Sequence, residues 1–245
     1  MKFNIVTIFP DELTRSLSYG VIGNAINDNK IKIDCYDPRI HADNKHDSID
    51  DKPYGGGPGM VMQAEPVLKS IQLARNGDIN IPVVFLSPQG KTFNQNKAKE
   101  LSKLNEIIIV SSRYEGLDQR AINQTDNHEE LSIGDYILSG GETACAVVID
   151  SISRLIPGVL GDSESILEES FNDGLLEYPH YTRPPEVNGD EVPEVLLSGD
   201  HQKINQWRRI QSLRNTYLKR PDLIDRSNLS EDEIGIIDDI KNDPE

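Results

Sequence analysis

Three short segments of the sequence combine glycines with polar side chains, and the first two follow apolar runs. They cover residues 87–92, 113–118 and 133–142. Glycine leaves the backbone uncovered, and a carboxylate such as Glu115 can accept hydrogen bonds from a ribose or an amino group. Because small molecules bind beyond the carboxyl ends of strands in open α/β sheets, the three segments together could enclose one small molecule. No single segment is specific for this chemistry, and each is also typical of a plain turn.

Two glycine-containing segments resemble nucleotide-binding loops but lack positions that those loops require. Residues 55–59 hold four glycines in five positions, which favours a binding or packing role over a flexible turn. They neither follow a strand directly nor open a helix, so the dinucleotide-binding pattern does not fit. Residues 90–92 read Gly-Lys-Thr, but Phe85 stands where the first glycine of a phosphate-binding loop belongs. The sequence therefore does not support an ATPase.

Two of the Ser-x-x-Glu patterns in the sequence predict helix starts, because a capping serine and a glutamate three residues later satisfy the first backbone amides. They are Ser139 with Glu142 and Ser165 with Glu168. In the first pattern, the two intervening glycines are expected to expose first-turn amides. Such amides favour a carboxylate or another electron-rich ligand group.

Glu169, unlike Glu168 beside it, has no structural explanation in the sequence. On a helix it would point about 100° away from Glu168, which the capping pattern accounts for. A carboxylate near an arginine such as Arg154 could act as a general base, although spacing alone favours a surface position. The histidines form neither a His-Glu-x-x-His motif nor a Ser/His/Asp order, so metalloprotease and hydrolase chemistry have no support.

Strand-like and helix-like segments alternate through the first 160 residues. We predict strands at 3–8, 30–36, 82–86 and 106–111, and helices at 20–27, 65–75, 94–104, 118–124 and 141–155. This alternation is typical of βαβ units and predicts an α/β fold with a mainly parallel sheet. Residues 161–200 are irregular and unusually long for a passive connection. Beyond them we predict a basic amphipathic helix at 200–220, ended by Pro221, and an acidic helix at 230–241.

Charge and cysteine content narrow the class of protein. The net charge of −16 over 245 residues argues at first sight against a nucleic-acid partner, because phosphates repel an acidic surface. Residues 201–220, however, carry six basic and no acidic side chains, a stretch also typical of a solvated helix face. The two cysteines form no CxxC or CxxH pattern, so no disulfide framework or zinc site is expected. Without a signal-peptide pattern or an apolar run near the roughly 18 residues of a membrane span, we expect a cytoplasmic protein.

Five segments occur in an order that closely resembles one family of enzymes. They are residues 54–60, 86–90, 113–116, 132–142 and 179–184. From about residue 3 to residue 223, the chain is similar to the bacterial tRNA (guanine-37-N1)-methyltransferases, which belong to the knotted SPOUT methyltransferases. The resemblance implies a parallel-sheet domain with a deep trefoil knot, a small, mainly helical C-terminal domain, and a homodimer with active sites at the interface. Nothing in the periodicity indicates a knot.

The resemblance also implies the reaction and its residues: methylation of N1 of guanine 37, next to the anticodon of tRNA, with S-adenosylmethionine as methyl donor. The residues expected around S-adenosylmethionine are Leu86, Ser87, Pro88, Gly90, Tyr114, Glu115, Gly116, Ile133, Gly134, Tyr136, Leu138, Gly140 and Gly141. Glu169 would be the general base, and Arg154 would stabilise guanine O6. The residues expected to bind tRNA are Lys203, Trp207, Arg208, Arg209 and Arg214. A dependence on magnesium is implied without identifiable ligands.

The expected domains are a methyltransferase domain at 1–160, a linker with the general base at 161–175 and a tRNA-binding domain at 176–245. The chain departs from the family pattern at two places. Glu169 stands where the family usually has aspartate, and residues 111–112 are Ser-Ser where Cys-Gly is common. Two alternatives stay open: a knotted methyltransferase acting on ribose 2′-hydroxyls or ribosomal RNA, and an RNA-binding protein that has kept the fold without the activity.

Overall fold

The structure is a computed structural model that describes residues 1–44, 46–161 and 169–242. The chain divides into two compact units, Met1–Gly161 and Asp162–Glu245. No helix among the described residues is long and apolar enough to cross a membrane.

The first unit is built on a five-stranded sheet in which every pair of neighbouring strands is parallel. The strand order is β2-β1-β6-β5-β7. The strands are β1 (Lys2–Val6), β2 (Lys32–Tyr36), β5 (Val83–Thr92), β6 (Glu106–Ser111) and β7 (His128–Ser132). The central strand β6 is buried on both faces, since Ile107 and Ile109 belong to one apolar cluster while Ile108 and Val110 belong to another. The predicted parallel sheet is therefore confirmed.

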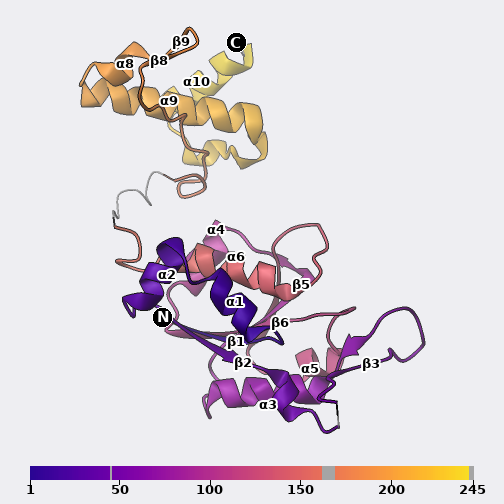
Figure 1. The fold of residues 1–245 in the computed structure, drawn as a ribbon. Coiled ribbons are helices and arrows are strands. Elements are labelled where there is room, and N and C mark those ends of the chain that lie inside the picture. The colour runs from indigo at the N-terminus through magenta and orange to yellow at the C-terminus, as the bar shows by residue number, and fades with distance from the viewer. Residues whose placement is uncertain (45, 162–168, 243–245) are drawn as a thin grey trace. The chain divides into compact units, whose positions relative to one another are not determined.

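Helices cover both faces of this sheet (Figure 1). One face packs against α1 (Pro10–Ser16), α2 (Gly20–Asn27), α4 (Gln95–Leu101) and α6 (Gly141–Ser153). The other face packs against α3 (Ala64–Arg75) and α5 (Gln119–Asn123). A 3-10 turn, η1 (Pro38–His41), and a small antiparallel ladder of β3 (Asp50–Asp51) with β4 (Val61–Met62) flank α3. The unit is thus a helix–sheet–helix sandwich.

The second unit is mainly helical. Its elements are β8 (Glu186–Val187), β9 (Asp190–Glu191), α8 (Glu194–Leu197), α9 (His201–Lys219), η2 (Pro221–Leu223), η3 (Arg226–Asn228) and α10 (Glu231–Asn242). A small core forms where Leu175, Leu213 and Ile237 pack together. The predicted helices at 200–220 and 230–241 are confirmed to within a residue at each end.

The structure corrects three predictions in the first unit. The strand predicted at 82–86 continues to Thr92, so that residues 87–90 bulge out of a ladder whose register shifts between Leu86 and Lys91. Strand β7 and helix α1 were not predicted. Helix α4 ends at Leu101 rather than at residue 104. The sheet therefore contains one more strand than the apolar runs indicated.

Candidate functional site

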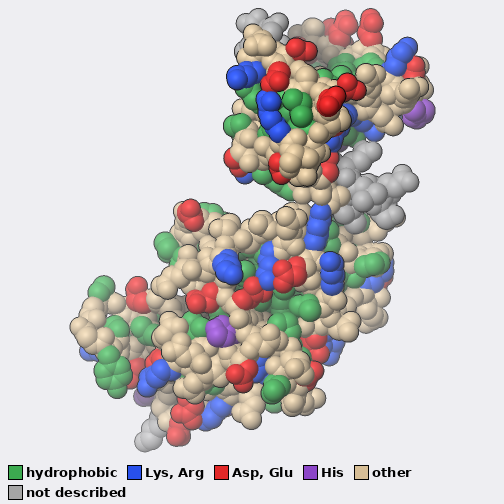
Figure 2. Space-filling model, turned by 180° about the vertical axis from the view of Figure 1, so that it is seen from behind, with side chains coloured by type: hydrophobic (Ala, Val, Ile, Leu, Met, Phe, Trp, Pro, Cys, Tyr) green, Lys and Arg blue, Asp and Glu red, His purple; other side chains and the backbone are tan. Residues whose placement is uncertain are grey.

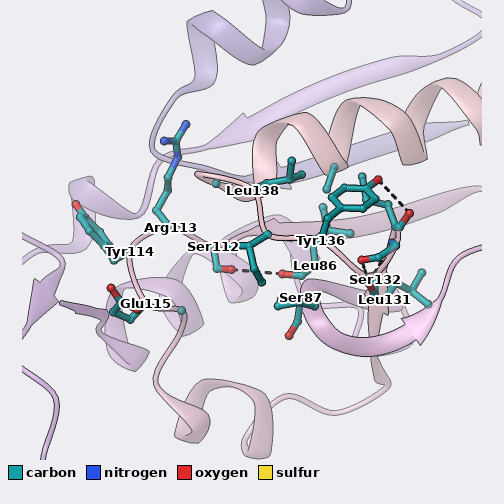
Figure 3. A pocket seen from close by; sticks show the side chains of 18 residues that line it. Leu86, Ser87, Ser112, Arg113, Tyr114, Glu115, Leu131, Ser132, Tyr136 and Leu138 are labelled. Carbon is teal, nitrogen blue, oxygen red and sulfur yellow. Dashed lines mark hydrogen bonds between the residues drawn. The ribbon is translucent and has the colours of Figure 1, made fainter. Parts of the chain in front are cut away.

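A pocket of about 240 Å³ lies at the carboxyl ends of β5, β6 and β7 (Figure 3). Three segments form it, one following each strand or bulging from it, as the rule for parallel sheets predicts. The lining residues are Leu86, Ser87, Pro88, Ser112, Arg113, Tyr114, Glu115, Gly116, Leu131, Ser132, Ile133, Gly134, Tyr136, Ile137, Leu138, Gly140, Gly141 and Ala144. Segments far apart in the sequence thus enclose one space.

The pocket brings together twelve of the thirteen residues expected around the methyl donor. The exception is Gly90, which is not among the lining residues of this pocket. A Cβ atom at Gly90 would lie 2.4 Å from the backbone nitrogen of Leu131. Gly90 is therefore explained by close packing of β5 against β7.

Close packing also accounts for the two glycines that precede and open α6: a side chain lies against Gly140 and backbone lies against Gly141. A Cβ atom at Gly140 would lie 2.2 Å from Nε of Arg113, and one at Gly141 would lie 2.8 Å from Cα of Ser111. The Gly141 amide donates to the Ser112 carbonyl oxygen at 2.9 Å. The expectation that both glycine amides face a ligand is therefore wrong for Gly141.

Arg113 lines the pocket and was not assigned a role from the sequence. Its Nε donates to Glu142 Oε2 at 2.8 Å and one terminal nitrogen donates to the Ser139 carbonyl oxygen at 3.3 Å. Its guanidinium carbon lies 4.5 Å from the centre of the Phe9 ring, which is a cation–π geometry. The side chain thus ties the segment before α6 to the strand-end segment of β6.

Glu142 shows that the predicted capping box at α6 is wrong. The N-cap residue is Gly140, and no side chain caps this helix. Glu142 instead accepts hydrogen bonds from Arg113 and from the fully buried Thr7 hydroxyl at 2.9 Å. These tertiary partners satisfy the carboxylate more fully than one backbone amide would.

Tyr114 and Glu115 lie side by side on the β6 side of the pocket (Figure 3). Tyr114 has φ of +59°, a sparsely populated backbone conformation that often marks functional sites. Burial and the neighbouring Asp50 raise the pKa of the Tyr114 phenol, so it stays a neutral hydrogen-bond donor. Glu115 supplies a carboxylate, which favours a ligand that carries positive charge or hydroxyl groups.

The glycine-rich segment 55–59 lies against this same part of the pocket. A Cβ atom at Gly59 would lie 2.3 Å from Glu115 Oε1. The Glu115 amide donates to the Met60 carbonyl oxygen, and the Met62 amide donates to the Gly116 carbonyl oxygen, both at 2.9 Å. Gly59 therefore has a packing role, while Tyr54 at the other end of the segment is fully exposed.

The two residues expected to be catalytic belong to different units. Arg154 is the C-cap of α6 in the first unit. Glu169 is half-buried in the second unit and lines a cavity of about 220 Å³ with side chains of the same unit. That cavity is lined by Glu169, Asp173, Leu175, Leu176, Glu177, Tyr178, Asn205, Arg208, Arg209 and Ser212. The predicted capping pattern of Ser165 with Glu168 lies outside the described residues.

The five residues expected to bind tRNA all lie on α9, and several have partners in the second unit. Lys203 pairs with Asp200 at 3.3 Å. Arg208 lies over the Tyr178 ring at 4.8 Å, and Trp207 lies 6.3 Å from the Tyr181 ring. The same helix carries Arg209 and Arg214. On the face drawn in Figure 2, basic and acidic side chains are interspersed on both units.

No group of three or more His, Cys, Asp or Glu side chains suited to a metal ion occurs within residues 1–44, 46–161 and 169–242.

Comparison with known proteins gives consistent matches over nearly the whole chain. The family model described as tRNA (Guanine-1)-methyltransferase TrmD matches residues 1–226. A tRNA (guanine-N(1)-)-methyltransferase of Buchnera aphidicola is 51% identical, over 98% of this chain and 91% of the relative. A protein of the same name from Clostridium perfringens is 49% identical over 97% and 99% of the two chains. Another from Pseudoalteromonas atlantica is 47% identical over 96% and 89%.

Proposed function

The chain belongs to the tRNA (guanine-N1)-methyltransferase family, and from that premise we propose that it methylates N1 of guanine 37, the base next to the tRNA anticodon. The chain is an enzyme of tRNA modification that uses S-adenosylmethionine. The observation that supports this proposal at the level of residues is the pocket at the carboxyl ends of β5, β6 and β7, which contains most of the residues expected to bind S-adenosylmethionine.

The pocket residues fit S-adenosylmethionine by their chemistry. Leu86, Ile133 and Leu138 offer apolar surface for a planar base. Gly140 lets the Arg113 side chain pack closely against the wall of the pocket, since a Cβ atom there would collide with it. The Glu115 carboxylate favours a ligand with positive charge. When bound, S-adenosylmethionine supplies a methyl group on a positively charged sulfur.

We propose that Glu169 removes the proton of guanine N1 and that Arg154 stabilises the negative charge that develops on O6. Guanine N1 is a poor nucleophile until its proton leaves, and a positioned carboxylate can accept that proton. A guanidinium at O6 acts where charge develops in the transition state. Glutamate in place of the family's aspartate keeps this chemistry but adds one methylene. The backbone at Glu169 must therefore lie slightly farther from the guanine.

The tRNA contacts that we propose come from α9, through Lys203, Trp207, Arg208 and Arg214. Basic side chains on one helix provide electrostatic affinity for phosphates despite the net charge of −16. Family membership supports four further properties that we carry over as proposals: the deep trefoil knot, the homodimer with active sites at its interface, the cytoplasmic location and the dependence on magnesium.

Product analysis tests the proposal. Unmodified tRNA with guanine 37 is incubated with the protein and S-adenosylmethionine, then digested to nucleosides that are identified by mass spectrometry. We expect 1-methylguanosine, and none from the same tRNA with adenine at position 37. A ribose 2′-O-methyl product would instead indicate another knotted methyltransferase, and tRNA binding without any product would indicate an RNA-binding protein. Calorimetry should show binding of S-adenosylmethionine and no binding of ATP.

The role of Glu169 has its own test in single-turnover methylation. Glu169→Gln should lower the rate about 10²–10⁴-fold, which is typical for loss of a general base, while both ligands still bind. Glu168→Gln is the matched control and should retain the parent rate. A parent-like rate for Glu169→Gln together with an inactive Glu168→Gln would exchange the two roles.

A further inference from the structure

The segment that carries Glu169 is held on α9 by buried and hydrogen-bonded contacts. Leu175 is 5% exposed and belongs to the same core as Leu213 of α9. The Leu176 amide donates to the Thr216 hydroxyl at 2.9 Å, and Thr216 is fully buried. The described end of this segment is therefore part of the second unit's structure.

The same segment closes on itself next to Glu169. The Phe171 amide donates to the Leu175 carbonyl oxygen at 2.7 Å, and the Glu177 amide donates to the Ser170 hydroxyl at 3.0 Å. Ser170 follows Glu169 directly, so the backbone beside the carboxylate is tied to the part of the segment that packs on α9.

Arg209 joins this segment to two helices through one guanidinium. From α9, its NH1 nitrogen donates to Asp173 at 2.5 Å and its Nε donates to Glu233 of α10 at 2.6 Å. Burial opposes the charge, but these hydrogen bonds outweigh it and raise the pKa of Arg209. Two carboxylates in fixed directions suit the planar fork of arginine and not the single ammonium of lysine.

The charge around Arg209 makes it a poor phosphate site. One positive charge faces two carboxylates within hydrogen-bond distance, so the local balance is negative. A phosphate placed there would meet like-charge repulsion from Asp173 and Glu233. Arg209 thus differs from a basic residue whose charge is directed at a nucleic acid.

We propose that Arg209 is a positioning residue, which holds the segment of Glu169 on α9 through Asp173, and that it makes no tRNA phosphate contact. The proposal rests on the proposed role of Glu169 as general base. Under this proposal α9 has two tasks. Lys203, Trp207, Arg208 and Arg214 bind tRNA, while Arg209 positions the general base Glu169.

Single-turnover methylation and tRNA binding separate these tasks. Arg209→Gln should lower the methylation rate at saturating tRNA and S-adenosylmethionine about 10²-fold, the cost of misplacing a catalytic group by roughly 1 Å. The tRNA dissociation constant and its salt dependence should stay at parent values. Arg214→Gln is the matched comparison: it should weaken tRNA binding and reduce the salt slope by about 1. A reduced salt slope with a parent rate for Arg209→Gln would overturn the proposal.

Combination with Glu169→Gln shows whether Arg209 acts through the base. In that background, Arg209→Gln should lower the residual rate no further, whereas a second 10²-fold loss would contradict the proposal. Arg209→Lys keeps the charge without the fork and should recover only part of the rate. Full recovery by Arg209→Lys would contradict the requirement for the fork.

Asp173→Asn decides the question even if Arg209→Gln does not fold, because it removes one arm and leaves the pair with Glu233. It should reproduce the rate loss, and a parent rate would overturn the proposal. If the parent protein itself forms no 1-methylguanosine, the proposed function fails instead, which is a separate result.

Discussion

The starts of α6 and α10 carry the same Ser-x-x-Glu pattern and use it differently. At α10, the Ser230 amide donates to Glu233 Oε2 at 2.8 Å and the Glu233 amide donates to the Ser230 hydroxyl at 3.3 Å, a complete capping box. At α6, Glu142 turns to Arg113 and Thr7 instead. A local pattern therefore decides the structure only where no distant partner competes for the carboxylate.

Both glutamates also accept a hydrogen bond from an arginine of another segment, at 2.8 Å for Glu142 and 2.6 Å for Glu233. They differ in what the arginine holds in place. Arg113 orders the wall of the pocket at the carboxyl ends of β5, β6 and β7, whereas Arg209 pairs with Asp173 in the segment of the proposed base. Variants of the Arg113–Glu142 pair and of the Arg209–Glu233 pair therefore allow effects on ligand binding to be compared with effects on the methylation rate.

The largest effect is expected from Glu142→Gln. The side chain is 11% exposed, and the charged hydrogen bond that it loses contributes about 1.5–3 kcal/mol. We expect that decrease in the free energy of unfolding, measured in urea, and about a tenfold weaker affinity for S-adenosylmethionine, measured by calorimetry. Glu65→Gln removes an exposed pair with Lys69 and is the control, with no resolvable change in the free energy of unfolding. Equal effects of the two variants would remove the special role of Glu142.

Glu233→Gln should have a smaller effect that depends on pH. Hydrogen bonds from Ser230 and Arg209 lower the pKa of Glu233 from 4.5. The carboxylate therefore stabilises the fold fully above pH 4.5, and this contribution is lost as the pH falls through the lower folded pKa. At pH 7 we expect the free energy of unfolding to decrease by about 1 kcal/mol. Unfolding can be monitored by the fluorescence of Trp207, the single tryptophan. The difference from the parent should vanish in acid; a constant difference would contradict this account.

Ser230→Ala removes the capping hydroxyl and should cost about 1 kcal/mol in the same fluorescence measurement. Ser230→Thr is the control, since it keeps a hydroxyl. No loss in Ser230→Ala would show that the pair with Arg209, and not the cap, holds the start of α10.

The smallest effect is expected from Ser139→Ala, which changes the corresponding position before α6. Its side chain caps nothing, so the free energy of unfolding should change by less than about 0.5 kcal/mol. A loss near 1 kcal/mol would restore the capping box that the sequence predicts.

Strong local signals account for the elements that were predicted correctly. The run of apolar residues in β6 gave its bounds of Glu106–Ser111. Strand β7 was missed because Leu131 is its one apolar side chain and no alternation is visible. It is an edge strand whose Glu129 is satisfied by Lys97 of α4 at 2.7 Å. Helix α1 had a usable signal, proline at its first position followed by two acidic residues.

The pocket could be predicted because strand ends, glycines and a family resemblance all indicate the same three segments. The Arg113 network could not, since Glu142 lies 29 residues and Thr7 lies 106 residues away from Arg113 in sequence. Nor could Gly90 be distinguished from its neighbours, because its closeness to Leu131 depends on the missed strand β7. Contacts with elements that are missed in the sequence, or that lie far away along the chain, cannot be predicted from local sequence patterns.

The pairing of β1 with β6 has a consequence for synthesis on the ribosome. Lys2 pairs with Glu106 and Val6 with Val110. The edge of β1 that pairs with β6 therefore has to wait, unpaired, until about 100 further residues have been synthesised. At about 5–20 residues per second, that wait lasts about 5–20 s. During this time Phe3 and Ile5, which are fully buried in the finished sheet, are without their β6 neighbours. Apolar side chains that are exposed in this way make a nascent chain prone to aggregation during that time.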